Sequence, residues 1–94
     1  MNNMQEIHKE FFETLSSIQD NAVYQTMSEY NKKDSLEDLL YNATYETIVA
    51  ICELIDGYTN DQIQFDLIDV KSNKSIKEGI QMHDACADYL KWKK

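Results

Sequence analysis

Two pairs of carboxylates with three-residue spacing could hold a metal ion: Glu10 with Glu13, and Glu53 with Asp56. Residues three positions apart lie on the same face of a helix, so each pair would present both carboxylates to one side. Paired carboxylates on facing helices can bind Mg²⁺ or Mn²⁺ through their oxygens. The four residues therefore predict a metal site between two helices as one alternative for this chain.

The same four residues carry a resemblance to a known family. Their spacing resembles the E-x-x-E and E-x-x-D pattern of the all-α nucleoside triphosphate pyrophosphohydrolases, the group of the MazG-like enzymes and dimeric dUTPases. The resemblance covers Glu10, Glu13, Glu53 and Asp56 only. It implies a helical, metal-dependent nucleotide hydrolase with Mg²⁺ or Mn²⁺ as cofactor, which is the enzymatic alternative for this protein.

His83 stands next to Asp84 and three residues before Cys86. An adjacent His-Asp pair supplies ligands in one family of metal-dependent phosphohydrolases, but that site also needs an upstream His and a distant Asp. The only other histidine is His8, near one end of the chain, so this site cannot be completed. We expect His83 to lie at the edge of the core, bonded to a backbone or carboxylate group, where it could respond to pH.

Tyrosines and carboxylates are mixed in the middle of the chain. Tyr and Trp are enriched among the anchors of protein interfaces, and Tyr41 and Tyr45 lie one helical turn apart. The simpler alternative is that these rings pack at the core edge with their hydroxyls in water. The predicted partner-binding residues are Glu37, Asp38, Tyr41, Tyr45, Glu46, Glu53, Asp56 and Tyr58.

The charge of the chain favours a basic protein partner. It has 17 acidic and nine basic residues, a net charge of −8, and residues 34–70 hold nine acids and no Lys. There is no Arg, the side chain that most often grips phosphates and guanine edges, and a negative field repels nucleic acid and anionic membranes. We therefore expect a non-enzymatic binding protein with no cofactor, in an inhibitory, immunity-type or regulatory role. Alternatively, the basic segment 71–94 neutralises the acidic middle.

The 94 residues predict a single domain, 1–94, large enough for one small core. No signal peptide is recognisable at the first residues, and the longest apolar stretch is about half a membrane span. We expect a cytoplasmic protein with reduced thiols at Cys52 and Cys86, although a disulfide between them is the alternative.

Helical spacing of apolar residues predicts a bundle of three to four helices. The first helix begins near residue 3 and could break at Asp20-Asn21. The second begins at Asp34 or Ser35 and ends at Gly57, and the last begins at the capping-box pattern Ser75 to Glu78. Residues 62–70 fit a short helix or irregular segment slightly better than a strand.

Two alternatives stay open for the architecture. A strand or hairpin around residues 62–82 would make the fold α+β. The 62–70 segment, or the wide apolar stripe of the helices, could also form a contact between two copies, since symmetric dimers are common.

Overall fold

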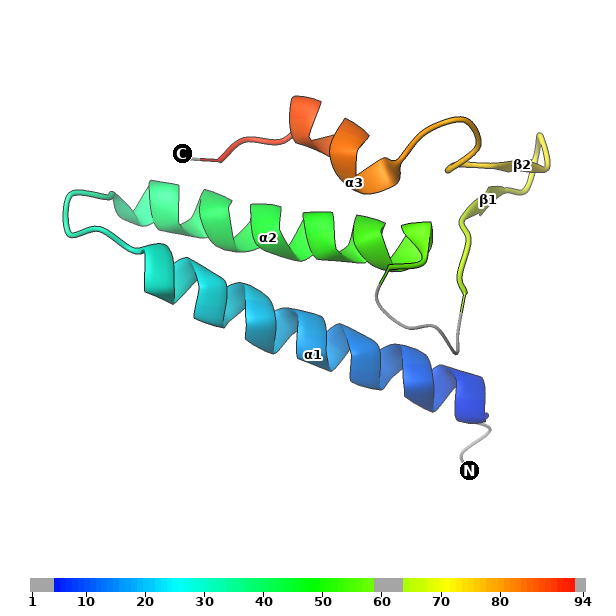
Figure 1. Cartoon of the computed structure of the whole chain (residues 1–94), viewed down its shortest axis with the longest axis horizontal. Coiled ribbons are helices and arrows are strands. Elements are labelled where there is room, and N and C mark those ends of the chain that lie inside the picture. Colours follow the sequence, from blue (N-terminus) through cyan, green and yellow to red (C-terminus); the bar gives the residue numbers. More distant parts are fainter. Residues whose placement is uncertain (1–4, 59–63, 93–94) are drawn as a thin grey trace.

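The computed structural model describes residues 5–58 and 64–92. Two long antiparallel helices, α1 and α2, form a hairpin, and the shorter C-terminal helix α3 lies along α2 on the side away from α1 (Figure 1). The predicted helical class is confirmed, with one small β-hairpin added to it. The elements are α1 Glu6–Glu29, α2 Leu36–Asp56, β1 Ile68–Asp69, β2 Lys74–Ser75, α3 Met82–Ala85 and a 3₁₀ turn at Cys86–Asp88.

Both ends of α2 follow the signals in the sequence. The hydroxyl of Ser35 accepts a hydrogen bond from the Asp38 N–H at 3.1 Å, and the Asp38 carboxylate accepts one from the Ser35 N–H at 3.2 Å. This reciprocal capping box satisfies two of the donors that a helix start leaves unpaired. At the other end Gly57 adopts φ +93°, the left-handed conformation that closes a helix, as predicted.

The first helix is continuous from Glu6 to Glu29, so the break considered at Asp20-Asn21 does not occur. Both of these residues are exposed, and water can satisfy their side chains without help from the backbone of α1. The helix ends at Tyr30, whose backbone is extended. In the connector, the Asn31 N–H donates to the Asp34 carboxylate at 3.0 Å, which fixes the tight return into α2.

The prediction that the last helix begins at Ser75 is wrong. Lys74–Ser75 forms strand β2 and pairs antiparallel with Ile68–Asp69. The Ser75 hydroxyl donates to the Asp66 carboxylate at 2.7 Å, a long-range contact that a local capping pattern does not reveal. The hairpin alternative is thereby confirmed over 68–75, residues 64–67 are irregular, and the predicted ambiguity at 62 and 63 falls outside the described residues.

The core of the described part is thin. Its buried apolar side chains are Ile18 and Ala22 of α1 with Cys52 and Leu54 of α2, of which Leu54 is the most enclosed. At the end of the helical hairpin of α1 and α2 that lies away from their connector, Phe11 packs edge-on against Phe65 with ring centroids 5.0 Å apart. Within the described residues no helix is long and apolar enough to cross a membrane. The hairpin of α1 and α2 is therefore held by few buried contacts, and most of its surface faces outward.

Replacing Thr26 by Val should stabilise the protein. The Thr26 side chain is buried, and among the described residues its hydroxyl has no hydrogen-bond partner, so the fold carries an unmatched polar group. Valine has nearly the same shape, and we expect the free energy of unfolding to rise by about 1 kcal/mol in a chemical denaturation experiment. The matched control is Thr14→Val, because the Thr14 hydroxyl donates to the Glu10 carbonyl at 2.9 Å. This interpretation would be contradicted if Thr14→Val raised the free energy of unfolding, or if Thr26→Val did not.

Candidate functional site

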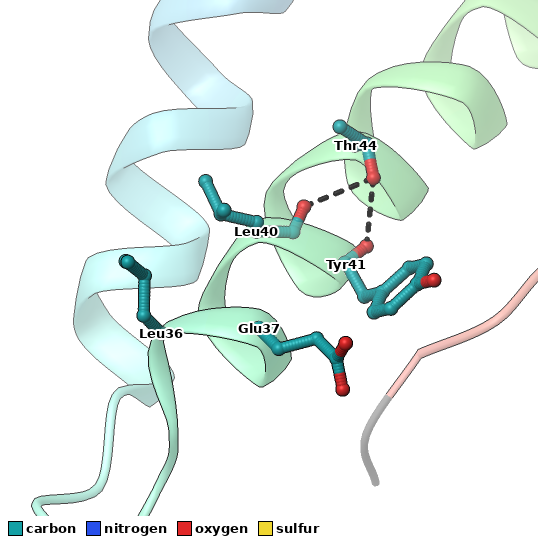
Figure 2. A pocket seen from close by; sticks show the side chains of 5 residues that line it. All are labelled: Leu36, Glu37, Leu40, Tyr41 and Thr44. Atoms are coloured by element: carbon teal, nitrogen blue, oxygen red, sulfur yellow. Dashed lines mark hydrogen bonds between the residues drawn. The ribbon is translucent and has the colours of Figure 1, made fainter.

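A shallow apolar depression lies at the start of α2. Leu36, Leu40 and Thr44 line it together with Glu37 and Tyr41, and it encloses about 480 Å³. Figure 2 shows Leu36 and Leu40 directed toward α1, while Glu37 and Tyr41 are directed toward the C-terminal segment. Leu36 is 70% exposed, an unusual environment for a large aliphatic side chain. The depression combines uncovered apolar surface with only one charged neighbour.

The predicted tyrosine pair serves two different purposes. The Tyr45 ring stacks on Trp92 at a centroid distance of 4.7 Å, which ties the C-terminal segment to α2. Burial raises the pKa of the Tyr45 hydroxyl, with smaller contributions from Cys86 and Glu46. Tyr41 is 40% exposed, and the Lys91 ammonium lies 5.9 Å from its ring centroid. Tyr41 therefore keeps surface available for a partner, whereas Tyr45 is used within the chain.

A second hollow, here called the acidic groove, runs between α1 and α2. It encloses about 280 Å³. Its carboxylates come from α2 and its amides from α1, and the small side chains between them form its floor. The lining residues are Ile18, Asn21, Ala22, Gln25, Glu46, Val49, Ala50 and Glu53.

Among the residues that the structure describes, no Lys neutralises the negative charge of this groove. Burial raises the pKa of Glu46, and the carboxylates of Glu29 and Glu53 raise it further. Within residues 5–58 and 64–92, none of the three forms an ion pair with a Lys. Lys77 donates instead to the backbone carbonyls of Ile55 at 3.1 Å and of residue 65 at 3.4 Å, at the negative end of α2. The groove therefore keeps a field that attracts cations.

Asp56 anchors α3 to the end of α2. Its carboxylate accepts hydrogen bonds from the Met82 N–H at 3.0 Å and the His83 N–H at 2.9 Å, and it lies 2.6 Å from the His83 Nδ1. The side chain of Asp56 is only 3% exposed. Tyr58 covers the pair, since its ring meets the His83 imidazole edge-on and its hydroxyl donates to Gln81 at 3.1 Å. We call this arrangement the Asp56 clasp.

The clasp shifts the titration of both partners. Burial alone would raise the pKa of Asp56, but hydrogen bonds from the His83 side chain and from two backbone N–H groups outweigh it and lower that pKa. The hydrogen bond to Asp56 raises the pKa of His83 above its ordinary value, against a smaller opposing effect of burial, and Asp84 adds to the rise. The charged pair is therefore favoured over the neutral one.

The eight predicted partner-binding residues therefore do not share one face. Glu37 and Glu46 stand nine positions apart, which places them on opposite sides of α2. Asp56 is enclosed in the clasp, and Tyr58 covers it. Asp38 belongs to the capping box at the start of α2. Of the set, the structure places Glu46 and Glu53 in one groove.

The four carboxylates of the metal-site alternative also lie in different environments. Glu10 and Glu13 are exposed on α1, Glu53 lines the acidic groove, and Asp56 is occupied by His83. Among the described residues, no group of three or more His, Cys, Asp or Glu side chains could hold a metal ion. Cys52 and Cys86 are free thiols, and burial together with a hydrogen bond to Cys86 raises the pKa of Cys52 to about 11.

Sequence reasoning overlooked two features of these sites. Glu29 was not grouped with Glu46 and Glu53, although the short connector of the helical hairpin brings the end of α1 close to α2. The prediction that His83 bonds to a carboxylate or backbone group is confirmed, but the sequence does not indicate that Asp56, 27 positions away, is that carboxylate, and Asp56 is predicted instead as a partner-binding residue. Asp56 lies beside Gly57, where α2 ends. A carboxylate at that position can cap the start of another helix, and this is the signal that could have indicated its bond to α3.

Comparisons with protein-family models, with curated proteins and with solved structures found no match. Any function must therefore be argued from the side chains themselves. The features available for that argument are the acidic groove, the apolar depression and the Asp56 clasp.

Removing the Asp56 carboxylate should detach α3. Asp56→Ala leaves two N–H groups and the His83 imidazole without their acceptor, and we expect a loss of about 2 kcal/mol or more in the free energy of unfolding. Asp84→Ala is the matched control, because Asp84 is 78% exposed and its oxygen lies 3.5 Å from the other ring nitrogen of His83. Asp84→Ala should change the free energy of unfolding little, because exposed ion pairs contribute little to stability. Equal effects of the two variants in urea denaturation would refute a special role for Asp56.

The clasp should also make stability depend on pH. Because folding raises the pKa of His83, its contribution is complete below the ordinary value of 6.5 and is lost as the pH rises through the folded-state pKa. Because folding lowers the pKa of Asp56, its contribution is lost below about 3.8 as the solution is acidified. His83→Asn keeps a donor near Asp56 without titrating, so its stability should stay flat where the parent protein loses stability above pH 6.5. His8→Asn should retain the parent's slope in the same denaturation series.

Proposed function

We propose that this is a non-enzymatic protein that acts by binding a basic protein partner through its acidic groove. The observation that carries the proposal is a trio of carboxylates without a Lys partner among the described residues: Glu46 and Glu53 line one hollow, and Glu29 of α1 lies close enough to raise the pKa of Glu46. The net charge of −8 extends this local field over the molecule. Together they favour a cationic ligand and disfavour nucleic acid and anionic membranes.

The repulsion within the trio argues against a purely solubilising role. Carboxylates that serve only solubility can spread apart in water, where they interact weakly. Here Glu46 lies half-buried near two like charges, which raises its pKa and is unfavourable for the ionised form. A Lys or Arg placed in the groove would relieve that repulsion. The groove is thus better suited to a bound cation than to water alone.

The rest of the groove suits a side chain that is both long and charged. Val49 and Ala50 offer an apolar floor to the stem of a Lys or Arg. The Asn21 amide can exchange hydrogen bonds with the partner's backbone, whereas the Gln25 amide nitrogen already donates to the Glu29 carboxylate at 2.6 Å. Electrostatic attraction would mainly speed association, and salt would weaken it. These properties fit an inhibitor, an immunity-type protein or a regulator, and the free thiols fit a reducing compartment such as the cytoplasm.

Capture experiments with charge-neutral variants test the proposal. We predict that the tagged protein retains a basic protein from its native lysate at low salt and releases it near 0.5 M salt, where screening shortens to about 4 Å. Glu46→Gln with Glu53→Gln should abolish this capture, because it removes the groove's charge with almost no change of shape. Glu10→Gln with Glu13→Gln is the control of equal charge change, since both residues are exposed on α1 outside the groove.

Two results would oppose the proposal. Unchanged capture by the Glu46 and Glu53 double variant would show that the groove is not the binding site. Loss of capture in the Glu10 and Glu13 control variant alone would place the binding site on the outer surface of α1. The same control variant tests the hydrolase alternative. That alternative requires millimolar Mg²⁺ or Mn²⁺ to raise the melting temperature of the parent protein. It also requires that this rise vanish in Glu10→Gln with Glu13→Gln.

A further inference from the structure

The C-terminal segment runs antiparallel to α2, and two contacts fix its register. His83 binds Asp56 at the end of α2, with 2.6 Å between the ring nitrogen and the carboxylate. Trp92 stacks on Tyr45, eleven residues earlier on α2, with the ring centroids 4.7 Å apart. Figure 1 shows the segment lying along α2 between these two places. The part of the segment between the contacts must therefore face the part of α2 between them.

Each of the two cysteines lies between these contacts, on the side that faces the other element. Cys52 comes seven residues after Tyr45 and four before Asp56, and these spacings place all three on one face of α2. Cys86 comes three residues after His83, about one turn further along α3 and the 3₁₀ turn that continues it. That 3₁₀ turn is itself in contact with α2. Because His83 faces α2, Cys86 faces it as well.

The two thiols meet where the segment passes over Cys52. A hydrogen bond between the side chains of Cys52 and Cys86 contributes to the raised pKa of Cys52. Cys86 also lies close enough to Tyr45 to raise the pKa of that hydroxyl. Both effects agree with the register that the Asp56 clasp and the ring stack impose. A disulfide needs two cysteines whose side chains already face each other across neighbouring backbone segments, and this fold provides that arrangement.

The two thiols differ in their access to water. Cys52 is 7% exposed, whereas Cys86 is half-buried. Burial is the main cause that raises the pKa of Cys52 to about 11, so this thiol stays protonated near neutral pH and is a poor nucleophile. Cys86 is therefore the sulfur that a dissolved oxidant reaches first, and Cys52 is the thiol next to it. Both are free thiols in this structure.

We propose that Cys86 and Cys52 form an oxidisable pair, which a peroxide converts into a disulfide between the C-terminal segment and α2. The Cys86 thiolate attacks one oxygen of hydrogen peroxide, the O–O bond breaks, and Cys86 becomes a sulfenic acid. The departing hydroxide takes up the proton that Cys86 released and becomes water. The Cys52 sulfur then attacks the Cys86 sulfur, the S–O bond breaks as the S–S bond forms, and hydroxide leaves as water with the Cys52 proton. The two sulfurs together lose two electrons, which the peroxide gains.

The disulfide would replace the Asp56 clasp as the main attachment of the C-terminal segment. It closes a loop that contains the β-hairpin, and a cross-link of this kind stabilises the folded chain. The reduced protein depends on the clasp, whose contribution changes with pH, whereas the oxidised protein does not. Disulfides in reducing compartments are mostly transient and redox-sensing, which matches a pair that is reduced at rest. Neither cysteine lines the acidic groove, so this inference does not rest on the proposed function.

The test is the equilibrium of the two thiols in mixtures of reduced and oxidised glutathione. The purified full chain is measured folded and in urea, and alkylation followed by mass spectrometry gives the fraction with an intramolecular disulfide. We expect the disulfide to be favoured at least about thirtyfold more in the folded chain, because a native disulfide stabilises the fold to that extent or more. Equal preference in the two states, or a preference for urea, would overturn the proposal.

Hydrogen peroxide and single variants test the order of the steps. Cys52→Ala should leave Cys86 as a sulfenic acid that dimedone labels, whereas Cys86→Ala should leave Cys52 unlabelled. The reverse labelling would overturn the order, and the glutathione measurement on the parent still decides the pairing if either variant fails to fold. In Asp56→Ala, amide exchange of α3 should be fast when the protein is reduced and slow when it is oxidised, while Asp84→Ala should stay protected in both states. Fast exchange in oxidised Asp56→Ala would contradict the proposed attachment.

Discussion

The constraint on which the rest of this structure depends is the scarcity of buried apolar side chains. Two helices of 24 and 21 residues meet around a core whose buried apolar side chains, among the described residues, are Ile18, Ala22, Cys52 and Leu54. An isolated helix of this length is marginal in water, and in proteins most helical stability comes from tertiary packing. Because α1 and α2 bury few apolar side chains, polar contacts must supply part of the stability of the fold. This explains why single polar contacts, rather than a broad core, hold the C-terminal part in place.

The Asp56 clasp is the clearest of those contacts. A four-residue helix such as α3 has almost no stability of its own, because helix nucleation is unfavourable. The carboxylate of Asp56 satisfies its first two N–H groups and binds its histidine at the same time. The stack of Tyr45 on Trp92 then fixes the segment that follows. Two local contacts thus hold a C-terminal segment that buries little apolar surface.

The acidic groove links the fold to the proposed function. Carboxylates of α2 line it beside the contact with α1, and their repulsion favours a bound cation. The apolar depression at the start of α2 has a different character, since Glu37 is the one carboxylate in its lining.

The sequence predicted the features that depend on near neighbours and missed those that depend on distant ones. The cap at Ser35 and Asp38 and the stop at Gly57 were predicted, because each is encoded within four residues. The helix start at Ser75 was wrong since Asp66, nine positions earlier, binds the same hydroxyl. The partnership of Asp56 with His83 required the path of the chain between them. The predicted acidic surface stays a prediction, and helical phase divides its members between opposite sides of α2.

The central claim is that the acidic groove between α1 and α2 binds a cationic protein partner. Capture from the native lysate at low salt, compared between the parent protein and Glu46→Gln with Glu53→Gln, tests this most directly. The account predicts that the parent retains a basic protein and that the double variant does not. Equal retention by the two proteins would contradict the claim.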